Sequence, residues 1–326
     1  MTTTYPYQFK SVNFTAPRPG VKLIVTGAVH GNETAGTKGI LRVLDELESG
    51  RLRIAAGSVT FVPVTNPMAY ELGQRSGERN LNRNLFPNAA PQDFEDHIAN
   101  WLCPLLAQHE VLLDLHSFNA RSEAFVMVGP RNNAGALQPF RHAEKERAMA
   151  RILGVRRFVD GWLATYGAGV QRRTGKGDDA ELSLQLRYGV GTTEYMRSTG
   201  GYALTLECGQ HQDPSAPDVA YRAIRNTLAF LGLVEEAAPT PIALDEMEYL
   251  SMVEVHDKLH EEDRFERVWS SFDLLAKGDR IGTRADGTPV LAPFDARILF
   301  PDVNARPNHE WFYLARTGGD FTRYAE

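Results

Sequence analysis

The chain has 326 residues, and its 41 acidic residues outnumber its 35 Lys and Arg, which gives a formal net charge of −6. This balance provides no general attraction to nucleic acid or to acidic membrane surfaces. No apolar run approaches the ~20 residues needed to span a bilayer. We therefore expect neither nucleic acid nor a membrane among its partners.

The number of cysteines and the first ten residues indicate the cellular compartment of the protein. Only two cysteines occur, Cys103 and Cys208, too few for a disulfide framework or for a zinc site built from thiolates. Residues 1–10 lack the charged-then-apolar pattern of a signal peptide. The sequence therefore predicts a cytoplasmic protein.

Up to about residue 235, short apolar runs rich in β-branched residues alternate with segments of helical periodicity. This alternation predicts an α/β fold with a sheet covered on both faces. In chain order we predict a strand at 21–29, a helix at 33–50, strands at 58–65 and 110–118 with a helix at 92–108 between them, and a strand at 202–209.

The sequence pattern changes at residues 235–245, EEAAPTPIALD, which contain two prolines. Beyond this linker, short β-like pieces alternate with turn signals, a spacing typical of a small β domain. We therefore predict an α/β domain at 1–237 and a small C-terminal β domain at 245–326. The segment 166–197, rich in Gly, Arg and Thr, is left unassigned.

The first candidate metal ligands follow the first predicted strand. His30 and Glu33 lie three residues apart where that strand gives way to a helix, and ligands collect at such strand ends in open α/β sheets. Imidazole and carboxylate are both good zinc ligands. Alone, the pair is weak evidence for a metal site, because a loop histidine followed by an acidic residue in the first turn of a helix gives the same pattern.

A third ligand should come from another strand end. His116 closes the apolar run VLLDLH, and Asp114, two residues earlier, points to the same face and could orient the imidazole. A catalytic zinc typically takes three protein ligands. His211 and His309 stay open as alternatives. Glu207, at the end of the run YALTL, is the candidate general base, and a structural carboxylate is the alternative.

Together these residues resemble the succinylglutamate desuccinylase/aspartoacylase family, relatives of the zinc carboxypeptidases. The matching motifs are His30-Gly31-Asn32-Glu33, Asp114-Leu115-His116 and Thr205-Leu206-Glu207. The resemblance implies a mixed sheet flanked by helices, with a small C-terminal β domain. It also implies one zinc ion per chain, held by His30, Glu33 and His116, with Glu207 as the catalytic base.

Arginines complete the resemblance. Asn66-Pro67, Arg75 and Asn80-Leu81-Asn82-Arg83 match a second family pattern. By that likeness Arg75 would stabilise the oxyanion, and Asn82 and Arg83 would bind a substrate carboxylate, as guanidinium groups do. Arg197 falls where the family carries another carboxylate-binding arginine. Asn80 departs from the family pattern, which has Asp at this position. The replacement removes a negative charge that would help to position a neighbouring arginine.

The resemblance implies hydrolysis of the linear amide bond of an N-acyl amino acid, a small-molecule substrate of amino-acid metabolism. A zinc carboxypeptidase acting on peptides or cell-wall fragments is one alternative. A non-catalytic, metal-containing ligand-binding protein is another. The acyl group and the amino acid are left open, as is a homo-oligomeric state.

Overall fold

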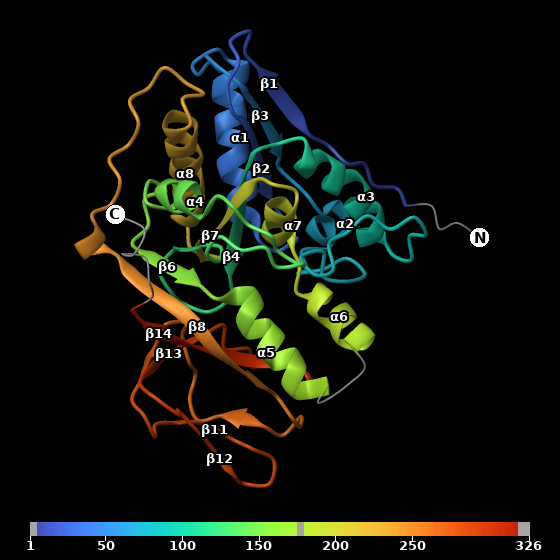
Figure 1. Ribbon diagram of the computed structural model, residues 1–326, viewed down its shortest axis with the longest axis vertical. Coiled ribbons are helices and arrows are strands. Elements are labelled where there is room, and N and C mark those ends of the chain that lie inside the picture. The colour runs from blue at the N-terminus through green and yellow to red at the C-terminus, as the bar shows by residue number, and fades with distance from the viewer. Residues whose placement is uncertain (1–4, 175–178, 319–326) are drawn as a thin grey trace. The chain divides into compact units, whose positions relative to one another are not determined.

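The computed structural model describes residues 5–174 and 179–318 and divides into two compact units (Figure 1). Within these ranges, the first unit runs to Phe118 and adds Glu123–Arg156 and Val190–Met247. The second unit comprises Asn119–Ser122, Arg157–Gly189 and the residues from Glu248 on. The predicted linker at 235–245 thus ends close to one of the divisions.

A mixed sheet forms the centre of the first unit. Its strands follow the order β1-β3-β2-β4-β7-β5, with β2, β3, β4 and β7 parallel and the two outer strands antiparallel to their neighbours. Because the four central strands are parallel, their carboxyl ends meet at one edge. The bounds are β1 Val12–Thr15, β2 Lys22–Gly27, β3 Ser58–Val62, β4 Val111–Phe118, β5 Phe125–Met127 and β7 Tyr202–Gln210.

Helices cover both faces of this sheet. On one face α1 packs beside α8, and its apolar stripe, which includes Ile40 and Val43, is buried against the strands. On the other face α3 and α7 cover β4 and β7. The bounds are α1 Thr34–Glu48, α2 Pro67–Leu72, α3 Phe94–Ala107, α4 Ala143–Ala150, α7 Thr192–Ser198 and α8 Ala216–Phe230, followed by a 3-10 turn, η1, at Leu244–Glu246.

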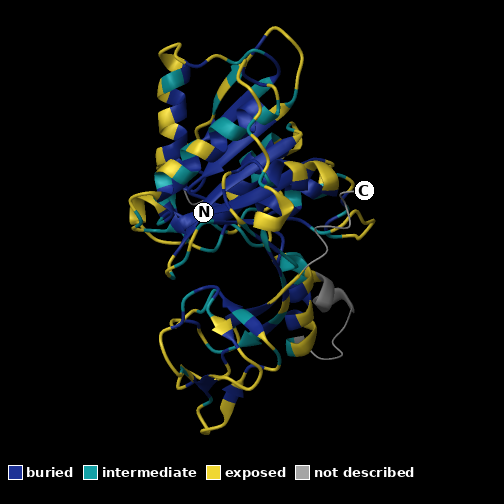
Figure 2. Ribbon diagram, turned by 90° about the vertical axis from the view of Figure 1, so that its left-hand side faces the viewer, coloured by how far each residue is buried: buried dark blue, intermediate teal, exposed yellow. Residues whose placement is uncertain are grey.

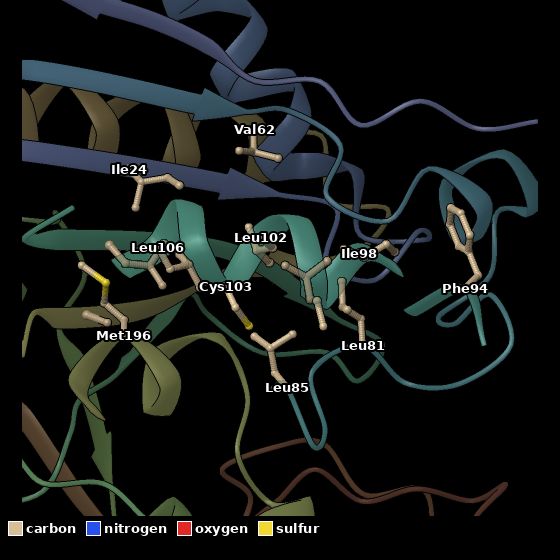
Figure 3. Close-up of a cluster of buried hydrophobic side chains, with 14 residues drawn as sticks. Ile24, Val62, Leu81, Leu85, Phe94, Ile98, Leu102, Cys103, Leu106 and Met196 are labelled. Carbon is tan, nitrogen blue, oxygen red and sulfur yellow. The ribbon is translucent and has the colours of Figure 1, made fainter. Parts of the chain in front are cut away.

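The core under α3 shows how the sequence sets this packing. Ile98, Leu102 and Leu106 recur at helical spacing and reach Ile24 and Met196 (Figure 3). The core strands of this unit are among its most buried segments (Figure 2). Burial of each large apolar side chain of this core, such as Leu102, contributes roughly 1.5–3 kcal/mol to the stability of the fold.

The second unit holds two smaller sheets. One has the order β6-β8-β14-β13-β10, parallel only between β6 and β8, and the other has the order β12-β11-β9. Trp269, Ile281 and Trp311 are central to its core. The bounds are β6 Arg157–Asp160, α5 Trp162–Thr174, α6 Asp179–Tyr188, β8 Glu248–Asp257, β9 Arg264–Phe265, β10 Leu274–Leu275, β11 Arg280–Thr283, β12 Pro289–Leu291, β13 Ala296–Leu299 and β14 Glu310–Thr317.

The predicted fold class is confirmed: a large mixed sheet flanked by helices, with smaller β structure toward the C-terminus. The unassigned segment 166–197 contributes to α5, α6 and α7, apart from residues 175–178, which lie outside the described residues. Among the helices of the described ranges, none is long and apolar enough to cross a membrane.

We predict that Gly31→Ala lowers the free energy of unfolding by at least about 2 kcal/mol, because a Cβ there has no room. That atom would lie 1.9 Å from the carbonyl carbon of Ala69, in α2. Gly73→Ala, at the end of the same helix, meets open space and a positive φ of 60°. It should cost only about 1 kcal/mol. Urea denaturation of both variants checks this, and equal losses would contradict it.

Candidate active site

The site forms where β2, β4 and β7 end. After β2, Ala28 adopts a positive φ of 47°, and the backbone N–H of Asn66 donates to its carbonyl at 3.0 Å. This turn brings His30 and Glu33 back over the ends of the strands. Glu33 occupies the N-cap position of α1, but its carboxylate makes no capping hydrogen bond. Its carboxylate is therefore not used as a hydrogen-bonding cap of the helix.

Three of the predicted ligands come together. One ligand atom each from His30, Glu33 and His116 lie within 4.8 Å of one another, and all three residues are buried. Oε1 of Glu33 lies 2.8 Å from Nδ1 of His30, and Oε2 lies 2.9 Å from Nδ1 of His116. Two nitrogens and a carboxylate thus converge from two strand ends and one helix start, a donor set that suits zinc.

In each of the two imidazoles, Nε2 lies within hydrogen-bond distance of a side-chain oxygen. Nε2 of His30 lies 3.0 Å from Oδ1 of Asn80, and Nε2 of His116 lies 2.8 Å from Oδ2 of Asp114. An oxygen acceptor at Nε2 favours a proton there, so Nδ1, which faces the Glu33 carboxylate, is the ring nitrogen that could bind a metal once it carries no proton. Asn80, which replaces the Asp of the family pattern, therefore still supplies an acceptor, but a neutral one.

Asp114 is itself fixed from two sides. Thr26 of β2 donates to its Oδ1 at 2.6 Å, and Thr192, the first residue of α7, donates to its Oδ2. These threonines carry no motif that sequence reasoning could use. Their position opposite Asp114 follows only from the strand register and from the packing of α7.

Electrostatics distinguish the three ligand candidates. Burial would raise the pKa of Glu33, but the two imidazoles more than offset it and hold that pKa well below its usual range. Burial, together with the charge of Arg75, lowers the pKa of His30 to about 4. Burial would also lower the pKa of His116, yet the carboxylates of Asp114 and Glu33 raise it well above its usual range. Metal binding must then displace a proton from His116, as is usual for such sites.

Glu207 lies beside this cluster. It is the β7 residue opposite His116, its side chain is buried, and its Oε2 has no hydrogen-bond partner. Burial and the charge of Glu33 raise the pKa of Glu207 to about 8. An unpartnered buried carboxyl is costly, and such groups concentrate at functional sites.

Arg75 reaches the cluster from the loop after α2. Its Nη1 donates to Oε1 of Glu33 at 3.0 Å, while about half of its side chain, 54%, is exposed. Arg83 and Asn82 follow on the same loop, with Nη1 of Arg83 donating to the carbonyl of Asn82 at 2.8 Å. Oδ1 of Asn82 accepts from the backbone N–H of Thr192 at 2.9 Å, which ties this loop to α7.

Arg197 is not brought to this cluster. Only 3% of its side chain is exposed, and its guanidinium forms a two-pronged contact with Glu146 of α4, at 2.8 and 3.1 Å. It also donates to the carbonyl of Ala203 at 2.6 Å. The predicted substrate arginine is thus committed to a buried ion pair, which sequence spacing cannot reveal, and we leave it out of the substrate site.

Of the two open histidines, one lies near the cluster. Nδ1 of His211 is 2.8 Å from Oγ of Ser117, whose backbone N–H donates to Oε2 of Glu33 at 3.2 Å. His309 belongs to the second unit, is exposed, and is not among the clustered ligands in the described residues.

The fold and the site together define an α/β protein with a candidate metal centre at the carboxyl edge of its sheet. Residues 19–154 match the family described as "Succinylglutamate desuccinylase/Aspartoacylase catalytic domain". The resemblance found in the motifs is therefore confirmed. No protein with a curated description matches the sequence.

Solved structures of similar fold include the succinylglutamate desuccinylase/aspartoacylase from Rhodobacter sphaeroides. It is 18% identical with a TM-score of 0.70, and the match covers 96% of this chain and 90% of that one. The ectoine utilization protein EutE (DoeB) from Ruegeria pomeroyi, in a product-bound structure, is 18% identical with a TM-score of 0.66 over 94% and 88% of the two chains. Succinylglutamate desuccinylase from Vibrio cholerae is 18% identical, with a TM-score of 0.68 over 94% and 85%. At these identities the likeness shows the fold.

We predict that Arg197→Met destabilises the protein by about 3 kcal/mol or more, because it leaves Glu146 buried without its cation. Arg51→Met, which removes an exposed arginine paired with Asp45, should cost less than about 1 kcal/mol. Urea denaturation of the two variants makes the comparison. Equal stabilities would show that Arg197 is not a structural cation.

In metal-depleted protein, we predict that Glu207→Gln gains stability relative to wild type as pH rises from about 4.5 to about 8. The pKa of Glu207 rises from its ordinary 4.5 to about 8 on folding. Its contribution is therefore fully present below pH 4.5 and is lost as pH rises through 8, whereas Gln does not titrate. Denaturant unfolding at pH 5 and pH 8 measures the difference, and a gap that stays constant would disprove the shift.

Proposed function

We propose that this protein is a zinc-dependent hydrolase that cleaves the linear amide bond of an N-acyl amino acid. The observation that carries the proposal is the buried triad of His30, Glu33 and His116 beside the unpartnered carboxyl of Glu207. A ligand set next to a base with a raised pKa is what metal-assisted hydrolysis requires. The family match supports the same general chemistry.

The residues present fit one zinc ion per chain. Both Nδ1 atoms face Glu33, and both Nε2 atoms are held by oxygen acceptors, so the donor atoms are oriented before any ion binds. Zinc, when bound, supplies the positive charge that polarises a carbonyl group and acidifies water. His30, Glu33 and His116 would hold it.

Glu207 acts as the general base and then as the general acid. Its carboxyl has no hydrogen-bond partner at Oε2 and a pKa of about 8, so it can take a proton from water and return it near neutral pH. The proton goes first from water to Oε2 and then from Oε2 to the leaving nitrogen. The products are a free carboxylate and an amine.

Arg75 and the residues after it bind the substrate. The guanidinium of Arg75 lies against Glu33 and is half exposed, so it can donate to the oxyanion that forms as water adds to the amide carbon. The side-chain amide of Asn82 and the guanidinium of Arg83 are proposed to bind a substrate carboxylate. Neutral amides should therefore be poor substrates.

A screen of N-acyl amino acids with zinc-loaded protein tests the proposal. Acyl chain and amino acid are varied separately, with dipeptides and neutral amides as controls. We expect turnover of one group of N-acyl amino acids and little turnover of the neutral amides. Preference for dipeptides would favour a carboxypeptidase, and zinc binding with no turnover would favour a metal-containing binding protein. Either result overturns the proposal.

We predict that Glu207→Gln reduces kcat by at least roughly 100-fold, because the amide cannot take a proton from water. Zinc content, measured by elemental analysis, should stay at one ion per chain, because Glu207 is not among the ligands. Steady-state kinetics on the best substrate from the screen gives kcat. Full activity of the variant would remove Glu207 from the mechanism.

A further inference from the structure

We propose that Glu95 is a positioning residue of this site, acting through the loop of residues 74–80 that carries Arg75 and Asn80. The inference rests on the proposed function and deepens it. Glu95 lies in the first turn of α3 and has no exposed surface. It contacts neither the metal ligands nor Glu207 by any described hydrogen bond, so its effect must be transmitted by the loop.

Both carboxylate oxygens of Glu95 are fully used. Oε1 accepts from Nδ2 of Asn66 and from the backbone N–H of Gly77, each at 2.9 Å. Oε2 accepts from the backbone N–H of Glu78 at 3.2 Å and of Arg79 at 3.1 Å. Four N–H donors thus converge on one buried acceptor, and three of them are consecutive backbone amides.

A carboxylate group suits this position better than an amide. It accepts at both oxygens without carrying a donor, and hydrogen bonds to a charged acceptor are about twice as strong as neutral ones. The first turn of a helix also favours a negative charge. The loop packs closely on it, since a Cβ added at Gly77 would lie 2.8 Å from Oε1 of Glu95.

The anchored amides lie between the two points where the loop touches the site. Before them, Arg75 donates to Glu33 at 3.0 Å, and after them Oδ1 of Asn80 lies 3.0 Å from Nε2 of His30. Glu95 therefore fixes the segment that spaces a half-exposed guanidinium from the acceptor behind a ligand imidazole. Displacement of this segment would move both contacts together.

Two further contacts make the anchor rigid. Leu81, directly after Asn80, and Phe94, directly before Glu95, belong to the same buried core (Figure 3). Asn66, the fourth donor to Glu95, uses its own Oδ1 to cap α2 by accepting from Ala69 at 3.1 Å. Loop, helix cap and core are thus joined at a single carboxylate.

The test is a double-mutant cycle with Arg75. In Glu95→Gln the new NH₂ group faces two of the four N–H donors, so the loop loses its anchor while the side-chain volume is kept. We expect Arg75→Ala to lower kcat/KM by roughly 100-fold and Glu95→Gln by roughly 10-fold or more. In the Arg75→Ala background, Glu95→Gln should add less than roughly threefold, because the residue it positions is already absent. Independent, multiplying effects would overturn the proposal.

Hydrogen exchange supplies a readout that needs no turnover. The amides of residues 77–79 should exchange at least roughly tenfold faster in Glu95→Gln than in wild type. Glu146→Gln is the matched control, since Glu146 is equally buried and accepts from Gly129, Arg197 and Ala203. It should lower stability without changing exchange in the loop or coupling to Arg75.

The outcomes separate the two proposals. Unchanged exchange at residues 77–79, or equal changes in both Gln variants, would show that Glu95 does not hold the loop. Faster exchange with a fully additive kinetic cycle would show that it holds the loop without positioning Arg75. If wild type hydrolysed no N-acyl amino acid, the proposed function would fall, and the exchange measurement alone would decide whether Glu95 anchors the loop.

Discussion

The convergence of two imidazoles and a guanidinium on the carboxylate of Glu33 is the contact on which the site depends. Oε1 meets His30 and Arg75, and Oε2 meets His116 and the backbone N–H of Ser117. A buried carboxylate is stable only when its charge is compensated in this way. The turn after β2, the end of β4 and the loop after α2 must therefore all be placed correctly for Glu33 to be accommodated.

The sheet edge provides that placement, and the sequence predicted much of it. The strands at 21–29 and 110–118 and the helix at 33–50 carry apolar patterns that packing preserves, so they appear as β2, β4 and α1 with ends shifted by a few residues. Because the strand ends were predictable, His30, Glu33 and His116 could be placed at one edge of the sheet as candidates, with His211 and His309 left open. The resemblance of the surrounding motifs to the family pattern then favoured these three residues as the ligand set.

What the sequence could not predict depends on contacts between distant segments. The spacing of Arg197 suggested a substrate residue, yet Glu146, 51 residues earlier, binds it in the interior. Conversely, Thr192 and Glu95 carry no motif, and their importance follows from what lies opposite them in space. Helices α5 and α6 escaped prediction because both have only weak amphipathic character, and Gly167 and Gly169 further weaken the helical pattern of α5.

The neutral amide behind His30 has a consequence for charge balance at the centre. Glu33 and Asp114 bring one negative charge each, the Arg75 guanidinium on Glu33 brings one positive charge, and Asn80 adds none. An aspartate in its place would add a negative charge beside the His30 ring, and like charges make neighbouring carboxyl groups harder to ionise. The asparagine adds no such charge, and it holds the His30 imidazole by a neutral hydrogen bond, which is weaker than one to a carboxylate.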